Sequence, residues 1–229
     1  MNNIPIRDLE TERLLIKKPT MKEQEDLWKI LREDIVNRYY FPTPDKIFEK
    51  NNLRKDNIDD LKEARRIFME KFNNWERQIP ILEDKINSIN NEENKNKFTW
   101  SIFLKDGPVI GQMTVQPSSE YPDNPEIRDV GWFIDPKYQR KGYASEAARE
   151  VLRFMFEEVE IEKIITSAST VNDGSWKLME KLGFIRYDEK PFTYYDKDDN
   201  ILTSYCYYID REKYLDKGKK YEKINIHNN

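Results

Sequence analysis

Apolar residues recur at a helical spacing through much of the first hundred residues of the chain. Residues 10–18 predict a strand, and the helix predicted after it has Leu27, Trp28, Ile30 and Leu31 along one face. Farther along, apolar residues three and four apart predict one long helix, which Pro80 ends or kinks because proline has no backbone N–H to donate. Its apolar face comprises Leu61, Ala64, Phe68, Phe72, Trp75 and Ile79. A shorter helix and a polar loop, residues 88–97, are predicted to follow.

From residue 98 onward the pattern changes to short strands divided by turns. The predicted strands are 98–105, 109–117, 128–135, 163–169, 184–189 and 201–210. A turn at Asp106, Gly107 and Pro108 joins the first two into a hairpin. Helices are predicted after the third and fourth strands, and Gly183 is placed to end the second of these helices. This order predicts a mixed α/β domain with one central sheet.

Length and charge narrow the class of protein. The chain has 229 residues, so we expect one domain with an ample core that carries an insertion. Its net charge of -4 predicts no broad cationic surface, which argues against nucleic acid or a membrane as a partner. Because no segment approaches the roughly 20 apolar residues that span a bilayer, and the N-terminus lacks the apolar run of a signal peptide, we expect a cytoplasmic protein.

A single cysteine and a single histidine limit the available chemistry. Cys206 has no partner for an internal disulfide, and its apolar and aromatic neighbours favour an ordinary buried strand residue. His227 lies in a polar tail. Neither a Cys/His zinc site nor a histidine-activated nucleophile can be assembled unless that tail folds back. We therefore expect no metal cofactor.

Residues 135–144 lie between a strand and the start of an amphipathic helix, where a phosphate can bind. The first backbone N–H groups of a helix have no partner within the helix, and the helix dipole adds partial positive charge, so a diphosphate is a natural ligand. Gly142 lets the backbone approach such a ligand. Lys137, Arg140 and Lys141 supply charge for a further phosphate. Taken alone, this loop is equally well explained as a solvated turn.

A second segment, residues 172–184, adds an amide and a helix end. Asn172 can cap a helix by accepting hydrogen bonds from backbone N–H groups, and its amide can also pair with an amide-rich ligand. Ending the helix is a sufficient role for Gly183. Local structure alone accounts for both residues, but their occurrence together with the basic loop favours a shared cofactor.

Together the two segments resemble the acetyl-CoA signature of the GNAT acetyltransferase superfamily. The residues that carry the resemblance are Gly131, Trp132, Phe133, Ile134, Gln139, Gly142, Ala144, Asn172, Ser175, Lys181, Gly183 and Phe184. The sequence is most similar to the branch that acetylates the N-termini of ribosomal proteins. The similarity covers 10–40 and 98–214, so we expect one domain, 1–229, with a helical insertion at about 42–97.

The resemblance implies a mixed, mostly antiparallel central sheet flanked by helices, with acetyl-CoA as co-substrate. The loop amides from Arg140 to Ser145 would hold the diphosphate. The backbone of Phe133 and Ile134 would pair with the pantetheine arm like an added strand, and Asn172 would contact the same arm. The cofactor-binding residues implied are Phe133, Ile134, Gln139, Arg140, Lys141, Gly142, Tyr143, Ala144, Ser145, Asn172 and Ser175.

The acid for the departing thiolate is less defined, because the chain departs from the family pattern. Met179 stands where many members have a tyrosine that protonates the thiolate, and residues 203–207 lack the Asp-His pair of the closer branch. Ser175 occupies the matching position in that branch. Tyr205 and Tyr207 have a side-chain pKa of about 10, better matched to a thiol of about 8.5, so position and chemistry disagree.

The acceptor amine must lose a proton, and the intermediate must be stabilised. Since histidine cannot serve, Glu120, acting through water, is the candidate base, although a solvated loop acid is an equally simple interpretation. A backbone N–H near Ile134 is the candidate oxyanion donor. An α-amine, with a pKa of about 7.7–8.0, asks less of a base than a lysine at about 10.4.

The sequence therefore predicts an N-acetyltransferase that moves the acetyl group of acetyl-CoA to a primary amine by direct attack in a ternary complex. The acceptor would be a protein N-terminus or a small-molecule amine. On this interpretation the insertion is a mobile cover with residues 88–97 as its hinge. The alternative is a non-catalytic acyl-CoA-binding module whose insertion binds a protein partner. A monomer and a homodimer both remain open.

Overall fold

The computed structural model describes residues 4–33, 35–36, 45–91, 97–195 and 200–216, with backbone alone at 45 and 190–195. The helices are α1 (Gln24–Arg32), α3 (Asp45–Asn51), α4 (Ile58–Phe72), α5 (Trp75–Asn90), α6 (Tyr143–Arg153) and α7 (Asp173–Leu182). The strands are β1 (Leu9–Glu10), β2 (Leu14–Lys17), β3 (Phe98–Leu104), β4 (Val109–Pro117), β5 (Ile127–Ile134), β6 (Lys163–Ser169), β7 (Ile185–Tyr195) and β8 (Ile201–Asp210).

Among these residues the strands form one sheet in the order β1-β2-β3-β4-β5-β6-β8-β7. Every neighbouring pair is antiparallel except β5 and β6, which run parallel. That parallel pairing extends only from Ile127 to Asp129 on β5, opposite Lys163 to Ile165 on β6. Beyond it the two strands diverge, and the sheet opens between them. The predicted mixed, mostly antiparallel fold is confirmed.

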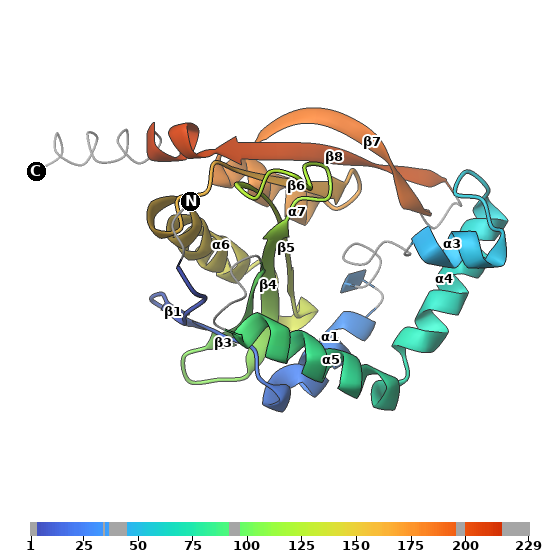
Figure 1. Cartoon of the computed structure of the whole chain (residues 1–229), viewed down its shortest axis with the longest axis horizontal. Coiled ribbons are helices and arrows are strands. Elements are labelled where there is room, and N and C mark those ends of the chain that lie inside the picture. Colours follow the sequence, from blue (N-terminus) through green and yellow to red (C-terminus); the bar gives the residue numbers. More distant parts are fainter. Residues whose placement is uncertain (1–3, 34, 37–44, 92–96, 196–199, 217–229) are drawn as a thin grey trace, which may run out of the picture.

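The main core lies between the sheet and helix α6. Buried residues of α6 pack against alternate residues of β5 and β6, which is the pairing that an amphipathic helix and a two-residue strand period predict. They include Val130, Ile134, Ala147, Val151, Ile164 and Ala168. Figure 1 shows α6 on one side of β4 and β5, with α1, α4 and α5 on the other. Cys206 is buried on β8, as predicted.

The long helix predicted to run to Pro80 is instead two helices, α4 and α5. The break falls at Asn73 and Asn74, and the Asn74 side chain accepts a hydrogen bond from the Arg77 amide at 3.1 Å. Pro80 lies inside α5 without ending it, so its missing N–H removes one helical hydrogen bond. At the break, the Trp28 indole donates to the Phe72 carbonyl at 3.0 Å and lies 5.0 Å from the Trp75 ring. These contacts attach the insertion to α1.

The rest of the insertion continues from α1 toward the far end of the sheet. Figure 1 shows α5, α4 and α3 forming an arch, and α4 contacts β7. The predicted hinge, residues 88–97, overlaps the end of α5, and its residues 92–96 lie outside the described part of the chain, as does His227. No helix in the described part has both the length and the apolar character needed to cross a membrane.

Candidate active site

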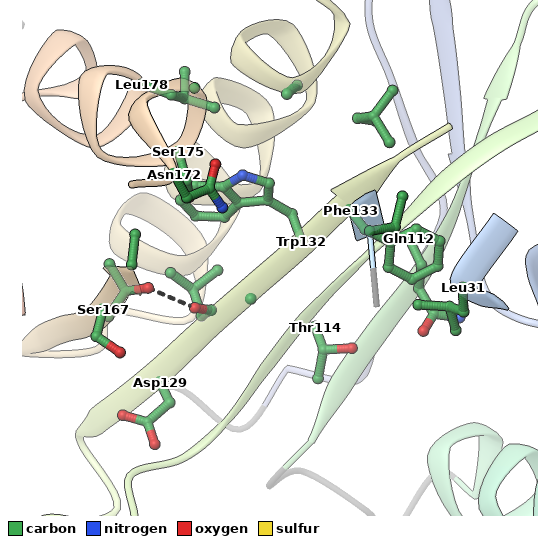
Figure 2. Close-up of a pocket in the computed structure, with 18 of the residues that line it drawn as sticks. Leu31, Gln112, Thr114, Asp129, Trp132, Phe133, Ser167, Asn172, Ser175 and Leu178 are labelled. Atoms are coloured by element: carbon green, nitrogen blue, oxygen red, sulfur yellow. Dashed lines mark hydrogen bonds between the residues drawn. The ribbon is translucent and has the colours of Figure 1, made fainter. Parts of the chain in front are cut away.

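A cavity of about 1470 Å³ passes through the opening between β5 and β6. On one side it is lined by the N-terminal ends of α6 and α7, including Gly142, Asn172 and Ser175. On the other side it is lined by α1 and by α4 and α5 of the helical insertion. Figure 2 shows Asn172 and Ser175 beside Trp132, with Gln112 and Leu31 across β5 from them. The cavity therefore has two mouths, one on each face of the sheet.

The loop before α6 has the backbone conformation of an anion-binding turn. Gly142 caps the helix with φ of +86°, and Arg140 also has a positive φ of +61°. The first hydrogen bond of the helix runs from the Glu146 amide to the Gly142 carbonyl at 3.0 Å. Because the amides of Tyr143, Ala144 and Ser145 precede that bond, none of them has a carbonyl partner within the helix. This geometry fits a diphosphate at the loop.

Arg13 holds the loop before α6 in place through hydrogen bonds. Its guanidinium donates to the Lys141 carbonyl at 3.2 Å and to the Glu146 carboxylate at 2.6 Å. Burial raises the pKa of Glu146, but hydrogen bonds from Thr11 and Arg13 outweigh it and hold that pKa below the ordinary value. The negative charge in the first turn of α6 is therefore neutralised by Arg13 and does not oppose a bound phosphate.

The N-terminus of α7 corrects one expectation. The Asn172 side chain makes no capping hydrogen bond; the backbone carbonyl of Asn172 instead accepts from the amides of Ser175 at 3.1 Å and Trp176 at 3.3 Å. The side-chain amide instead lines the cavity. Gly183 ends α7 in the left-handed conformation with φ of +97°, as predicted.

The edge of β5 presents backbone groups to the opening. The Asp135 amide donates to the Ile110 carbonyl on β4 at 2.7 Å. Because successive amides of an antiparallel strand point to opposite sides, those of Ile134 and Trp132 are directed away from β4 and toward the opening. The Gln139 side chain, donating to the Ile134 carbonyl at 2.8 Å, lies on that same side. Gly111 permits this arrangement, since a Cβ there would lie 2.2 Å from the Phe133 carbonyl oxygen.

The candidate catalytic residues fall into two groups. Ser175 and Glu120 line the cavity, and the Tyr187 hydroxyl donates to the exposed Glu120 carboxylate at 3.4 Å. Tyr207 is fully buried on β8 and is not among the residues that line the cavity. Its hydroxyl donates to Glu180 at 2.9 Å and accepts from Arg186 at 3.1 Å. This position favours a structural role for Tyr207.

Sequence reasoning missed Asp129, a carboxylate on β5 that lines the cavity. Its Oδ2 accepts from the Ser119 amide at 3.1 Å. Burial raises the pKa of Asp129, and the Ser119 hydrogen bond only partly offsets this. The one signal in the sequence was an acid placed inside a predicted strand. Among the described residues no group of His, Cys, Asp and Glu could hold a metal ion.

Comparison with known proteins agrees with this geometry. Residues 13–185 match the family model described as "Acetyltransferase (GNAT) domain". The chain is 41% identical over 58 residues to the uncharacterized N-acetyltransferase YnaD of Bacillus subtilis, covering 25% of this chain and 34% of that protein. The chain thus spans about a third of the length of this relative.

Two solved structures share the fold at low sequence identity. RimJ from Mycobacterium smegmatis, in complex with CoA-disulfide, has a TM-score of 0.63 at 13% identity, covering 92% of this chain and 90% of the other. The ribosomal-protein-S5-alanine acetyltransferase from Vibrio fischeri has a TM-score of 0.60 at 15% identity, covering 90% and 98%. The domain match over most of the length, on this fold, shows that the chain belongs to the GNAT family of acetyltransferases.

Proposed function

We propose that this acetyltransferase binds acetyl-CoA and a primary amine at the same time and transfers the acetyl group directly between them. The observation that carries the proposal is the cavity that crosses the sheet between β5 and β6. Two substrates can enter it from opposite faces and meet at the opening. Binding from opposite faces lets both substrates be present at once, which direct transfer requires.

Acetyl-CoA would occupy the mouth formed by α6 and α7. The loop amides from Lys141 to Ser145 would hold its diphosphate, and the Asn172 amide and the edge of β5 would hold the pantetheine arm. The family uses acetyl-CoA, and a structural neighbour binds a CoA derivative. The acceptor would then approach from the face covered by α1, α4 and α5.

The reaction needs an uncharged amine, an oxyanion donor and an exit for the thiolate. The amine nitrogen would attack the acetyl carbonyl carbon, and the negative charge on its oxygen would be stabilised by the Ile134 amide. Asp129, whose pKa burial raises, is better suited than the exposed Glu120 to take the amine proton. As the C–S bond breaks, Ser175 would donate a proton to the sulfur.

The acceptor would be a primary amine, on a protein N-terminus or on a small molecule. No observation favours the non-catalytic alternative, since α4 and α5 direct side chains into the cavity. The proposed single domain with an insertion at 42–97 accounts for this arrangement: the insertion completes the acceptor mouth.

The test is a transfer assay with purified protein, acetyl-CoA and a mixed panel of amines. Release of CoA thiol, together with acetylated product detected by mass spectrometry, is the expected result. Initial rates at varied concentrations of both substrates should give intersecting lines, as a ternary complex requires. Parallel lines, or transfer through an isolable acetyl-enzyme, would contradict direct attack. Gly142→Val, which places a side chain at φ of +86° in the loop, should abolish acetyl transfer in the same assay, because it blocks CoA binding.

A further inference from the structure

The sheet face beneath the insertion is polar where it lines the cavity. Gln112 and Thr114 on β4 alternate with Met113 and Val115, which belong to the main core on the opposite face. Ser169 on β6 and Ser204 on β8 are register partners and also line the cavity. Both serines are buried, and neither hydroxyl has a hydrogen-bond partner among the described residues. Buried hydroxyls of this kind are ordinarily satisfied, so this face is built to receive a polar ligand.

Two lysines enter the same cavity from the insertion side. Lys85 lies on the face of α5 that also presents Gln78, Ile81 and Leu82 to the cavity, and Lys97 immediately precedes β3. Within the described residues, neither ammonium group takes part in an ion pair. Burial, with the nearby charge of Lys97, lowers the pKa of Lys85 to about 8, and burial also lowers the pKa of Lys97.

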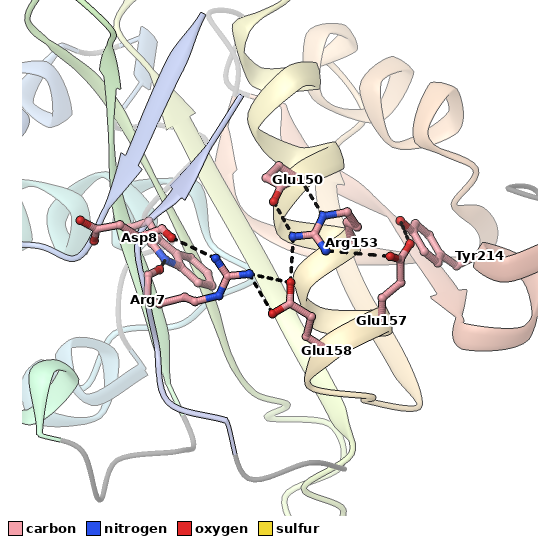
Figure 3. A network of polar contacts seen from close by, with 8 residues as sticks. Arg7, Asp8, Glu150, Arg153, Glu157, Glu158 and Tyr214 are labelled. Atoms are coloured by element: carbon pink, nitrogen blue, oxygen red, sulfur yellow. Dashed lines mark hydrogen bonds and ion pairs between the residues drawn. The ribbon is translucent and has the colours of Figure 1, made fainter. Parts of the chain in front are cut away.

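The cations Arg7 and Arg153, by contrast, are paired with carboxylates. Figure 3 shows Arg153 held between Glu150 and Glu158, with Arg7 on the same Glu158 carboxylate. Two neighbouring positive charges in a cavity, with no carboxylate between them in the described part of the chain, cost free energy that an apolar pair of similar size would not. An anion bound between them would remove that cost.

The cavity also contains negative charge, but on other elements. Asp129 lies on β5 and Glu120 in the loop before it, whereas both lysines come from the chain segment around 85–97. A ligand that carries both an amine and an anionic group can satisfy the two kinds of charge at once. A simple aliphatic amine would leave the lysines without a partner.

We propose that the acceptor carries a carboxylate or phosphate group in addition to its amine, and that this anionic group binds between Lys85 and Lys97. The inference rests on the proposed function, because it places the acceptor at the mouth opposite acetyl-CoA. It narrows the substrate class to small molecules such as amino acids or phosphorylated amines. The acetyl transfer itself is unchanged, since the anionic group takes no part in bond making.

The first test measures anion binding without turnover. The protein is saturated with CoA, so that the diphosphate loop is occupied, and titrated by calorimetry with inorganic phosphate and separately with acetate. Wild type should bind one of them at a single site, and Lys85→Gln or Lys97→Gln should weaken that binding about tenfold or more, because each removes a charge-assisted hydrogen bond. Lys85→Arg, which keeps the charge, should retain binding.

The matched control is Lys71→Gln, which removes the same charge from an exposed position of α4 that does not line the cavity. It should bind the anion like wild type. Equal loss in the control, or undiminished binding in both cavity variants, would overturn the proposal. The same holds if neither anion binds the CoA-loaded protein.

The second test uses paired acceptors that differ only in the anionic group: glucosamine 6-phosphate against glucosamine, and alanine against alaninamide. One anionic member should exceed its neutral partner at least tenfold in kcat/KM, and Lys85→Gln should erase that preference, whereas the control Lys71→Gln should retain it. The pair that shows the preference identifies phosphate or carboxylate. A preference for both neutral members would refute the inference, whereas CoA binding without transfer to any amine would count against the proposed function alone.

Discussion

The two faces of the sheet differ in the side chains that cover them. On the α6 face, Phe98, Trp100 and Phe154 are fully buried and their rings contact one another. On the face toward α4 and α5, hydroxyls and lysines line a cavity that crosses the sheet. The comparison indicates that one face supplies most of the stability of the domain. The other face gives up stability to keep polar groups ready for a ligand, as active sites commonly do.

The largest expected effect tests the apolar face. Phe154 lies 5.8 Å from Trp100 and 6.0 Å from Phe98, in edge-to-face contacts, and is fully buried. Phe154→Ala should lower the free energy of unfolding by about 3–5 kcal/mol, because it removes a large buried side chain and leaves a cavity. Chemical denaturation would measure the loss. A loss below about 1 kcal/mol would show that this face is not the main source of stability.

Asp129→Asn tests the polar face at a partly buried carboxylate that lines the cavity. If Asp129 accepts the amine proton, kcat should fall about 10²-fold or more, with CoA affinity unchanged. The base must be ionised, so wild-type activity should fall as the pH is lowered through the raised pKa of Asp129. The Asn variant should lack that acidic limb. Glu120→Gln is the control: a larger rate loss there would return the role to the exposed carboxylate.

Ser175→Ala compares two candidates for the leaving-group acid. Ser175 lines the cavity, whereas the Tyr207 hydroxyl is bonded to Glu180 and Arg186. We expect Ser175→Ala to slow acetyl transfer about 10²- to 10⁴-fold, and Tyr207→Phe to leave the rate near wild type while lowering stability by about 1 kcal/mol. Single-turnover rates would separate the chemical step from CoA binding. The opposite pattern would reassign the acid to the buried tyrosine.

The sequence predicted the features that lie within one continuous segment and missed those that combine residues from separate segments. The α6 loop and the α7 start are each one continuous segment, so their glycines, charges and helix signals are visible in the residue order. The proposed acceptor mouth combines Lys85, Lys97 and Asp129 from separate parts of the chain, and only the fold brings them together. The division of α4 from α5 was also missed, because the apolar period continues from Phe72 to Trp75 across the break.

Lys85 offers a pH test of the cost carried by the polar face. Its pKa is about 8 in the folded protein against an ordinary 10.5, so between those values the unfolded chain holds a proton that the folded chain has lost. Stability from this group therefore rises as pH increases from about 8 toward 10.5, and its full cost is present below 8. Lys85→Met should thus be more stable than wild type at pH 7, by about 1 kcal/mol or a Tm higher by about 2–4 °C.

The difference between the Met variant and wild type should shrink when unfolding is repeated at pH 8, 9 and 10. A constant difference would mean that the gain came from packing of the methionine. Lys71→Met, at an exposed site, should change stability little at any of these pH values.

The smallest expected change in stability compares the hydroxyl of Ser204, a proposed binding group, with that of Ser101, a structural group. Ser101 and Ser204 are both buried strand serines, but the Ser101 hydroxyl donates to Glu23 at 2.8 Å, whereas the Ser204 hydroxyl has no partner within the residues that the structure describes. Ser101→Ala leaves a buried carboxylate short of a hydrogen bond and should cost about 1–3 kcal/mol. Ser204→Ala removes a hydroxyl whose burial is uncompensated, so stability should stay the same or rise by up to about 1 kcal/mol. If the Ser204 hydroxyl instead binds the acceptor, the same variant should raise the acceptor KM several-fold with no change in CoA affinity. Equal destabilisation by the two substitutions would mean that Ser204, like Ser101, serves the fold, and the polar face would then lose one of its proposed contacts to substrate.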